Sequence, residues 1–138
     1  MTGRRAAPEV RIRRAYDPPE EADGFRILVD RLWPRGLRRD GAWIDLWLKE
    51  VAPSNALRQW FGHDPDRWTE FRTRYRAELR GSSVLESLLA EVARHRQVTL
   101  LFGARDVAHN NAVVLREICA RGGRGQTPAA PAVMPPQT

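Results

Sequence analysis

The sequence predicts a single α/β domain in which helices flank a mostly parallel sheet. Two strongly apolar segments, Phe25–Asp30 and Gln97–Gly103, indicate strands that are buried on both faces, as in a parallel sheet. Segments with the apolar spacing of helices lie between and after them, and strands separated by helices are typical of this fold class. With 138 residues, the chain is long enough for one hydrophobic core but not for two.

The first part of the chain alternates strands with irregular segments. Glu9–Ala15 is expected to be a strand, with Val10 and Ile12 on one face and arginines on the other. Two prolines and an Asp-Gly pair predict a loop over 16–24, before the strand at 25–30. One proline, two glycines and four arginines make 31–41 irregular. Residues 42–51 fit a strand and a helix equally well, because their apolar residues occur at both spacings.

Capping residues mark the expected helices. Ser54 can cap a helix that runs to Trp60 or Phe61, and Asp64 followed by Pro65 can begin the next one. Gly81 is expected to end that helix, and Ser83 to begin a third. After the strand at 97–103 and a short loop, a last helix is expected over 109–120. The apolar residues expected to face the core from these helices are Trp68, Phe71, Tyr75, Leu79, Leu85, Leu88, Leu89, Val92, Ala112, Val113, Leu115 and Ile118.

The positive charge is concentrated at the two ends of the chain. Residues 1–14 contain five basic side chains and one acidic one, and residues 120–138 contain two basic side chains and no acidic one. Residues 15–119 contain 16 of each sign, so the net charge of +6 lies wholly in the ends. A body without net charge does not attract a phosphate backbone, which leaves the ends as the expected contacts with nucleic acid.

Composition also limits the domain and its location. The segment 122–138 is rich in Gly, Pro and Ala and predicts a disordered tail, and 1–8 predicts a flexible arm, so the single α/β domain is expected over 9–121. No apolar stretch is long enough to cross a membrane or to form the centre of a signal peptide. Cys119 is the one cysteine, which permits no internal disulfide and fits a cytoplasmic protein.

Polar residues cluster after the two apolar strands, at 30–36 and at 103–111. Ligands of open parallel sheets bind beyond the carboxyl ends of the strands, so the two clusters are expected to converge there. Their residue types indicate an anion-binding pocket with acid–base groups. The guanidinium groups of Arg31, Arg35 and Arg105 can bind an anion, and Asp30, Asp106 and His109 can transfer protons. The side-chain amides of Asn110 and Asn111 could orient a ligand, and the indole of Trp33 could stack on a flat ring. The free N–H groups at the start of the last helix also favour an anion.

Structural roles could explain the same residues. The alternatives are an ion pair of Asp30 with Arg31 or Arg35, an ion pair of Arg105 with Asp106, helix capping by Asn110 or Asn111, and core packing by Trp33. In the segment that joins two helices, Asp64 is explained by capping, whereas His63 could turn into the pocket. A metal bound by His63, His109 and an aspartate has suitable ligand types but no supporting short-range spacing, so no metal site is expected. Cys119 is expected to be a small buried hydrophobe, because nothing nearby marks an activated thiolate.

Three blocks carry a resemblance to a known family: VDRLWPRGL at 29–37, APSNALRQWFGHDP at 52–65 and LLFGARDVAHNNAVVL at 100–115. The chain resembles the short, YeaO-like branch of the domain-of-unknown-function 488 family over nearly all of 9–119. The resemblance implies a flavodoxin-like or Rossmann-like fold in a bacterial cytoplasmic protein, and it assigns no activity. Longer relatives have a cysteine-histidine-arginine sequence after the last strand, where this chain has His109-Asn110-Asn111, so thiol chemistry is not expected from that block.

These features lead to one main hypothesis and two alternatives. The main hypothesis is a cytoplasmic protein that binds a small anion, nucleotide- or phosphosugar-like, at the strand ends. If it is an enzyme, we expect a metal-independent hydrolase or transferase with Asp106 or Asp30 as base, His109 as acid and the three arginines stabilising charge. The alternatives are a non-catalytic ligand-sensing or protein-interaction module with the same pocket, and a nucleic-acid binder that uses its basic ends. The sequence indicates no cofactor and no oligomeric state.

Overall fold

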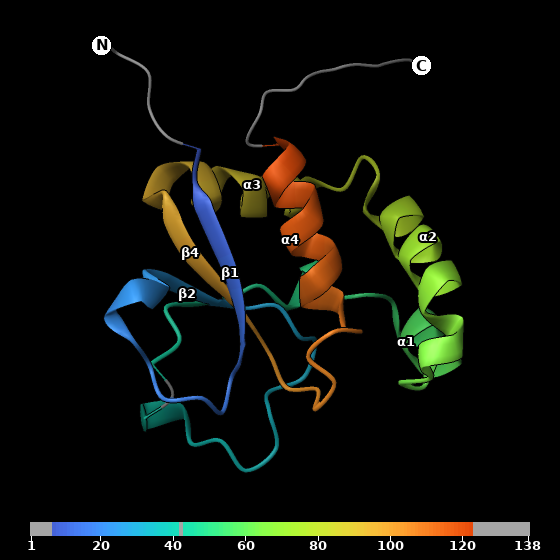
Figure 1. Cartoon of the computed structure of the whole chain (residues 1–138), viewed down its shortest axis with the longest axis horizontal. Helices are drawn as coiled ribbons and strands as arrows, with labels where there is room; N and C mark the ends of the chain where they lie inside the picture. The colour runs from blue at the N-terminus through green and yellow to red at the C-terminus, as the bar shows by residue number, and fades with distance from the viewer. Residues whose placement is uncertain (1–6, 42, 123–138) are drawn as a thin grey trace.

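The structure is a computed structural model and describes residues 7–41 and 43–122. Within these residues four strands form one sheet, and every pair of neighbouring strands is parallel (Figure 1). The strands are β1 (Glu9–Arg14), β2 (Phe25–Leu28), β3 (Leu46–Trp47) and β4 (Gln97–Phe102), and their order in the sheet is β1-β4-β2-β3. The last strand of the sequence therefore lies between the first two, with Ile12 and Ile27 both aligned with Leu100. The predicted α/β class and the predicted parallel sheet are confirmed.

The helices begin close to the predicted caps. They are α1 (Asn55–Phe61), α2 (Trp68–Leu79), α3 (Ser83–His95) and α4 (Asn111–Gly122). The Ser54 hydroxyl accepts a hydrogen bond from the Leu57 amide at 3.1 Å, as predicted for an N-cap. Asp64 caps a short 3-10 turn that precedes α2, and the hydroxyl that caps α3 belongs to Ser82 rather than Ser83.

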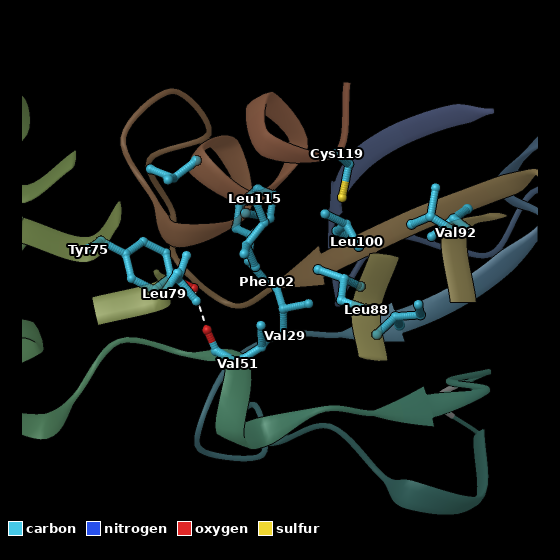
Figure 2. Close-up of a cluster of buried hydrophobic side chains, with 14 of the residues drawn as sticks. Val29, Val51, Tyr75, Leu79, Leu88, Val92, Leu100, Phe102, Leu115 and Cys119 are labelled. Atoms are coloured by element: carbon cyan, nitrogen blue, oxygen red, sulfur yellow. Dashed lines mark hydrogen bonds between the residues drawn. The ribbon is translucent and has the colours of Figure 1, made fainter. Parts of the chain in front are cut away.

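The larger core lies between the helices and one face of the sheet (Figure 2). Alternate residues of β4, namely Val98, Leu100 and Phe102, point to this face. They meet apolar side chains from all four helices, which are Leu57, Phe61, Phe71, Tyr75, Leu79, Leu88, Val92, Ala112, Val114, Leu115 and Cys119. The helical spacing of the sequence therefore predicted correctly which side of α2, α3 and α4 is buried.

The opposite face of the sheet is covered by loops. Leu28 and Leu101 point to this face and form a second, smaller apolar cluster with Ala15. Trp33 and Trp47, from the segment after β2, pack against the cluster with their rings 5.4 Å apart in an edge-on arrangement. Both indoles can pack against this face because their N–H groups are satisfied. Trp33 donates to the Leu37 carbonyl at 2.6 Å, and Trp47, in β3, donates to the Asp30 carbonyl at 2.7 Å.

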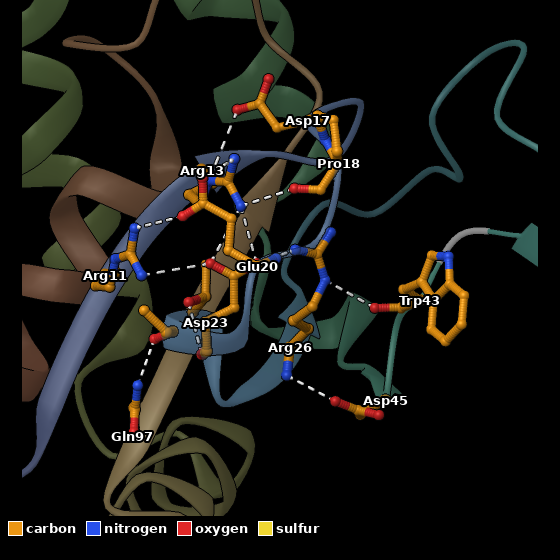
Figure 3. A network of polar contacts seen from close by, with 12 residues as sticks. Arg11, Arg13, Asp17, Pro18, Glu20, Asp23, Arg26, Trp43, Asp45 and Gln97 are labelled. Carbon is orange, nitrogen blue, oxygen red and sulfur yellow. Dashed lines mark hydrogen bonds and ion pairs between the residues drawn. The ribbon is translucent and has the colours of Figure 1, made fainter.

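The same face carries a buried cluster of charges around Asp23 (Figure 3). Asp23 is fully buried, and its carboxylate contacts the guanidinium of Arg13 at 2.9 Å and that of Arg26 more closely. The Glu20 amide donates to the same carboxylate at 3.0 Å, and the Arg26 Nε donates to the Trp43 carbonyl at 2.8 Å. This cluster fixes the loop that connects β1 to β2.

Some boundaries differ from the predictions. In the described part of the ambiguous segment, 43–51, the regular elements are the two-residue strand β3 and a 3-10 turn over Lys49–Val51. The last helix begins at Asn111, two residues later than predicted, because Asn110 caps it. The expected tails, 1–8 and 122–138, lie almost entirely outside the described residues. No helix in the described parts of the chain is long and apolar enough to cross a membrane.

Candidate functional site

A cavity of about 390 Å³ lies at the carboxyl ends of β2 and β4. The loop after β2 contributes residues 30–35 to its wall, and the loop after β4 contributes 103, 104 and 109–111. Arg58 and Phe61 of α1 and His63 in the following turn complete one side. Parallel strands end at the same edge of a sheet, which explains why these distant segments of the chain meet.

Asp30 is the carboxylate of the cavity wall. Its Oδ2 accepts a hydrogen bond from the Gly103 amide at 2.8 Å, so it joins the end of β2 to the end of β4. Burial raises the pKa of Asp30 above its ordinary value, and the Gly103 amide and the Asn111 side chain oppose this shift only in part. Among the described residues, Asp30 forms no ion pair with Arg31 or Arg35.

Cations outnumber this carboxylate in the wall. The wall contains three guanidinium groups and two imidazoles around one carboxylate. Arg31 lies 3.4 Å from the carbonyl oxygens of Ala52 and Pro53, and Arg58 donates to the Asn55 side chain at 3.0 Å. The cavity is therefore suited to a negatively charged ligand.

His109 lies in the cavity wall and is held there by two neighbours. Its Nδ1 is 2.9 Å from Oδ2 of Asp106, and its ring packs edge-on against Trp68 with the ring centroids 5.2 Å apart. The bond to the His109 ring, together with the Ala108 amide, holds the pKa of Asp106 below its ordinary value. Asp106 itself does not line the cavity. It orients the imidazole, which leaves Nε2 as the nitrogen available to a ligand.

Asn110 and Asn111 line the cavity but also have structural partners. The Asn110 side chain is buried, accepts from the Val113 amide at 3.2 Å and donates to the Asp106 carbonyl at 2.9 Å. The Asn111 side chain donates to the Val29 carbonyl at 2.9 Å. The capping role considered for Asn110 is therefore present, and Asn111 connects the start of α4 to the end of β2.

His63 reaches the cavity through an unusual backbone conformation. Its φ is 57°, in the left-handed region that a non-glycine residue rarely adopts. The preceding Gly62 has φ 54° and ends α1, so the chain reverses before Asp64 caps the next turn. The side chain of His63 is exposed and forms part of the cavity wall. Strained residues of this kind are concentrated at binding sites.

Trp33 and Arg105 are placed differently from the other predicted residues. Trp33 touches the cavity but packs into the smaller apolar cluster, and Arg39 lies over its ring at 4.5 Å. Arg105 lines a neighbouring hollow instead of the cavity. It does not pair with Asp106, whose partner is His109.

The structure thus brings eight of the predicted residues into one cavity wall: Asp30, Arg31, Trp33, Arg35, His63, His109, Asn110 and Asn111. The prediction omitted Arg58 and Tyr16, which also line the cavity. Tyr16 follows β1, so the strand-end rule that identified the other two loops could have identified it. Arg58 lies five residues before His63 on a helix, and no pattern in the sequence distinguishes it from other exposed arginines.

The described residues contain no group of three or more His, Cys, Asp or Glu side chains placed to hold a metal ion. His63 and His109 share the cavity wall with Asp30, but they do not form such a group. Cys119 is 3% exposed in the core, and burial raises the pKa of its thiol to about 12.

Comparison with known proteins gives one consistent result. The family model described as "Inactive DUF488-N3 subclade" matches residues 9–134. An uncharacterised protein of Mycobacterium tuberculosis is 42% identical over 109 residues, which cover 79% of this chain and 92% of the relative. YeaO of Escherichia coli, also described as uncharacterised, is 41% identical over 108 residues, which cover 78% of this chain and 94% of YeaO. No solved structure matches the chain.

Proposed function

This chain belongs to the DUF488 family, and we propose that it binds a small anionic ligand, nucleotide- or phosphosugar-like, in the cavity at the carboxyl ends of β2 and β4 without converting it. The charge of the cavity wall carries this proposal. Three guanidinium and two imidazole groups surround a single carboxylate, and that carboxylate is already bonded to the Gly103 amide. An anion would gain charge-assisted hydrogen bonds from this wall, whereas a cation would be repelled.

Binding without turnover is supported by two observations. The matching subclade is described as inactive. In addition, Asp106, one of the two residues expected as a base, lies outside the cavity wall and is engaged by His109 and by two backbone amides. We further propose a bacterial cytoplasm as the location, which is supported by the bacterial relatives and by the free thiol of Cys119.

Metal-independent hydrolysis or group transfer is the second candidate function. It is favoured by the position of Asp30, a buried carboxyl with a raised pKa that lines the same cavity as His109. Asp30 would be the base, because a raised pKa makes a carboxylate a stronger proton acceptor, and the imidazole of His109 would be the acid.

A thermal-shift screen of nucleotides, sugar phosphates, inorganic phosphate and carboxylates tests the proposal. A ligand present at 100 times its Kd stabilises the fold by about 2.7 kcal/mol, which raises the Tm of a domain of this size by about 10 °C. The shift should shrink in Arg58→Gln and His63→Ala, because both side chains are exposed on the cavity wall. It should persist in Arg116→Gln, which removes an exposed charge from α4 outside the wall.

Three outcomes would overturn the proposal. If none of the anions stabilises the protein, it does not bind such a ligand. If a stabilising ligand is converted to products, and conversion but not affinity is lost in His109→Ala, the protein is an enzyme. If only DNA or RNA binds, and binding disappears when residues 1–6 and 123–138 are removed, the basic ends and not the cavity account for function.

A further inference from the structure

A second hollow, of about 480 Å³, adjoins the cavity and is lined by Arg14, Tyr16, Arg35, Gly103 and Arg105. We propose that it is the subsite for the phosphate group of a phosphate monoester whose organic part occupies the cavity. This inference rests on the proposed function, and it names the ligand class and the residues that select it. Three of these five residues are arginines, and none of the five carries a carboxylate.

Two of these arginines have no partner within the part of the chain that the structure describes. Neither the Arg35 nor the Arg105 guanidinium forms a hydrogen bond or an ion pair with a residue in 7–41 or 43–122. The arginines around Asp23 differ, because each of them contacts a carboxylate. Guanidinium groups gathered around one hollow repel each other unless an anion lies between them, so their arrangement is best explained by a ligand.

Contacts of the Arg14 and Tyr16 side chains hold together the segments that line the hollow. Arg14 donates to the carbonyl oxygens of Ala104 and Gly103 at 3.0 and 3.2 Å, and its guanidinium lies 4.8 Å from the centre of the Tyr16 ring. The Tyr16 hydroxyl donates to the Arg35 carbonyl at 2.7 Å. The ends of β1 and β4 and the loop after β2 are therefore joined around the hollow. A ligand would not have to order these segments on binding.

A tight turn presents Arg35 to the hollow. The Leu37 amide donates to the Pro34 carbonyl at 3.2 Å, which closes the turn over 34–37. Gly36 has φ 81°, a conformation that suits glycine and is strained for other residues. Pro34 is buried while Arg35 is exposed, so the turn anchors one residue and directs the next outward.

The hollow and the cavity share part of their walls. Tyr16, Arg35 and Gly103 line both of them, so one ligand could occupy both. Phe61 and Phe71 contribute apolar surface to the cavity, which suits the organic part of a ligand. Three guanidinium groups can donate hydrogen bonds to several oxygens of a phosphate dianion. A ligand with one carboxylate group has only two oxygens and would leave some of these guanidinium donors without an acceptor. A phosphate monoester therefore fits the two compartments better than a simple carboxylate.

Isothermal titration calorimetry with inorganic phosphate, phenyl phosphate and benzoate tests this inference on the full chain at one ionic strength. Phenyl phosphate should bind about tenfold more tightly than inorganic phosphate, because its ring enters the cavity, and both should bind more tightly than benzoate. Arg105→Gln and Arg35→Gln should each weaken phosphate binding about tenfold or more. Both side chains are exposed and have no partner among the described residues, so these variants should fold normally. Arg116→Gln removes the same charge away from the hollow and should bind phosphate like the wild type.

The result that overturns the subsite differs from the result that overturns the proposed function. If phosphate binds but Arg105→Gln binds it like the wild type, and Arg58→Gln or His63→Ala loses it, the anion lies in the cavity and only the subsite assignment fails. If phenyl phosphate binds no more tightly than inorganic phosphate, the organic part does not enter the cavity and the ligand class is wrong. If benzoate and other carboxylates bind while both phosphates do not, the subsite fails and anion binding stands. If no anion binds at all, the proposed function fails first.

Discussion

Asp23→Asn tests the buried charge cluster that fixes the loop between β1 and β2. The Asp23 side chain is fully buried, and Arg26, its nearest cationic partner, is only 4% exposed. Asparagine has nearly the same size as aspartate and keeps an oxygen for the Glu20 amide. The substitution therefore removes the negative charge and little else, which leaves the Arg26 guanidinium buried without its partner.

The expected loss of stability follows from these contacts. Removing one partner of a buried ion pair costs about 3–5 kcal/mol, because the other charge remains desolvated. Arg13 contributes less to this loss, since it is 14% exposed and also donates to the Pro18 carbonyl at 2.9 Å. We expect Asp23→Asn to lower the free energy of unfolding by about 3 kcal/mol, a large part of the 5–15 kcal/mol typical of a domain.

The pH dependence of stability should change as well. Burial by itself raises the pKa of Asp23, but the Glu20 amide and the guanidinium groups of Arg26 and Arg13 outweigh it and hold the pKa below its ordinary value. An acid with a lowered pKa stabilises the fold above its unfolded pKa of about 4, and this contribution is lost as the pH falls through the folded pKa. The wild type should lose this stability in acid, whereas Asp23→Asn has none of it to lose.

Urea denaturation followed by tryptophan fluorescence, at pH 7 and at pH values below 4, measures both effects. The matched control is Asp40→Asn, because Asp40 forms an ion pair with Arg38 at 3.1 Å on the exposed surface. That control should change stability by less than about 1 kcal/mol. The double variant Asp23→Asn with Arg26→Met should recover part of the loss, since the unpaired charge is gone. If Asp23→Asn costs no more than the control, the buried charge pair does not hold this loop.

Three further predictions concern single buried positions. Tyr75→Phe should lower the free energy of unfolding by about 1–3 kcal/mol, because the fully buried Tyr75 hydroxyl donates to the Val51 carbonyl and phenylalanine leaves that oxygen unsatisfied. An unchanged midpoint of chemical denaturation would contradict this prediction. Gly24→Ala should cost about 3 kcal/mol or more, since φ is 64° and a Cβ would lie 2.1 Å from the Gln97 carbonyl oxygen, and thermal melting would show the loss. Cys119 should react with iodoacetamide at pH 8 only as fast as the protein unfolds, because the thiol is buried and its pKa is raised to about 12. Rapid labelling of the native protein, detected by mass spectrometry, would contradict this prediction.

Hydrophobic patterning predicted most of the fold because each strand and helix has a locally readable signal. The runs that became β2 and β4 are largely apolar and buried on both faces, and Ser54 and Asp64 are residue types that cap helices. The two polar clusters were predicted to meet because parallel strands share an edge. Core packing was one of two roles left open for Trp33, and 31–41 was predicted to be irregular. The path of this irregular chain could not be predicted, because it is ordered by tertiary contacts and not by a repeating pattern.

The charged residues show the limit of this approach most clearly. Asp23 and Arg26 are polar residues at the end of a loop and the start of a strand, and nothing in their spacing indicates that both are buried. Arg14 becomes part of the second hollow only because β1 lies beside β4, a neighbour relation that depends on strand order. Residue types therefore indicated the chemistry of the site, while strand order decided which arginines share it.

The position of β4 has a consequence for the order in which the protein can form. A growing chain that ends before Gln97 contains β1 and β2 but not the strand that separates them in the sheet. β1 then has no partner to pair with, and β2 can pair only with the two-residue strand β3. The helices that follow have no complete surface to cover. Folding on the ribosome must therefore wait until almost the whole domain has emerged, and the unpaired early segments are exposed to aggregation for that time.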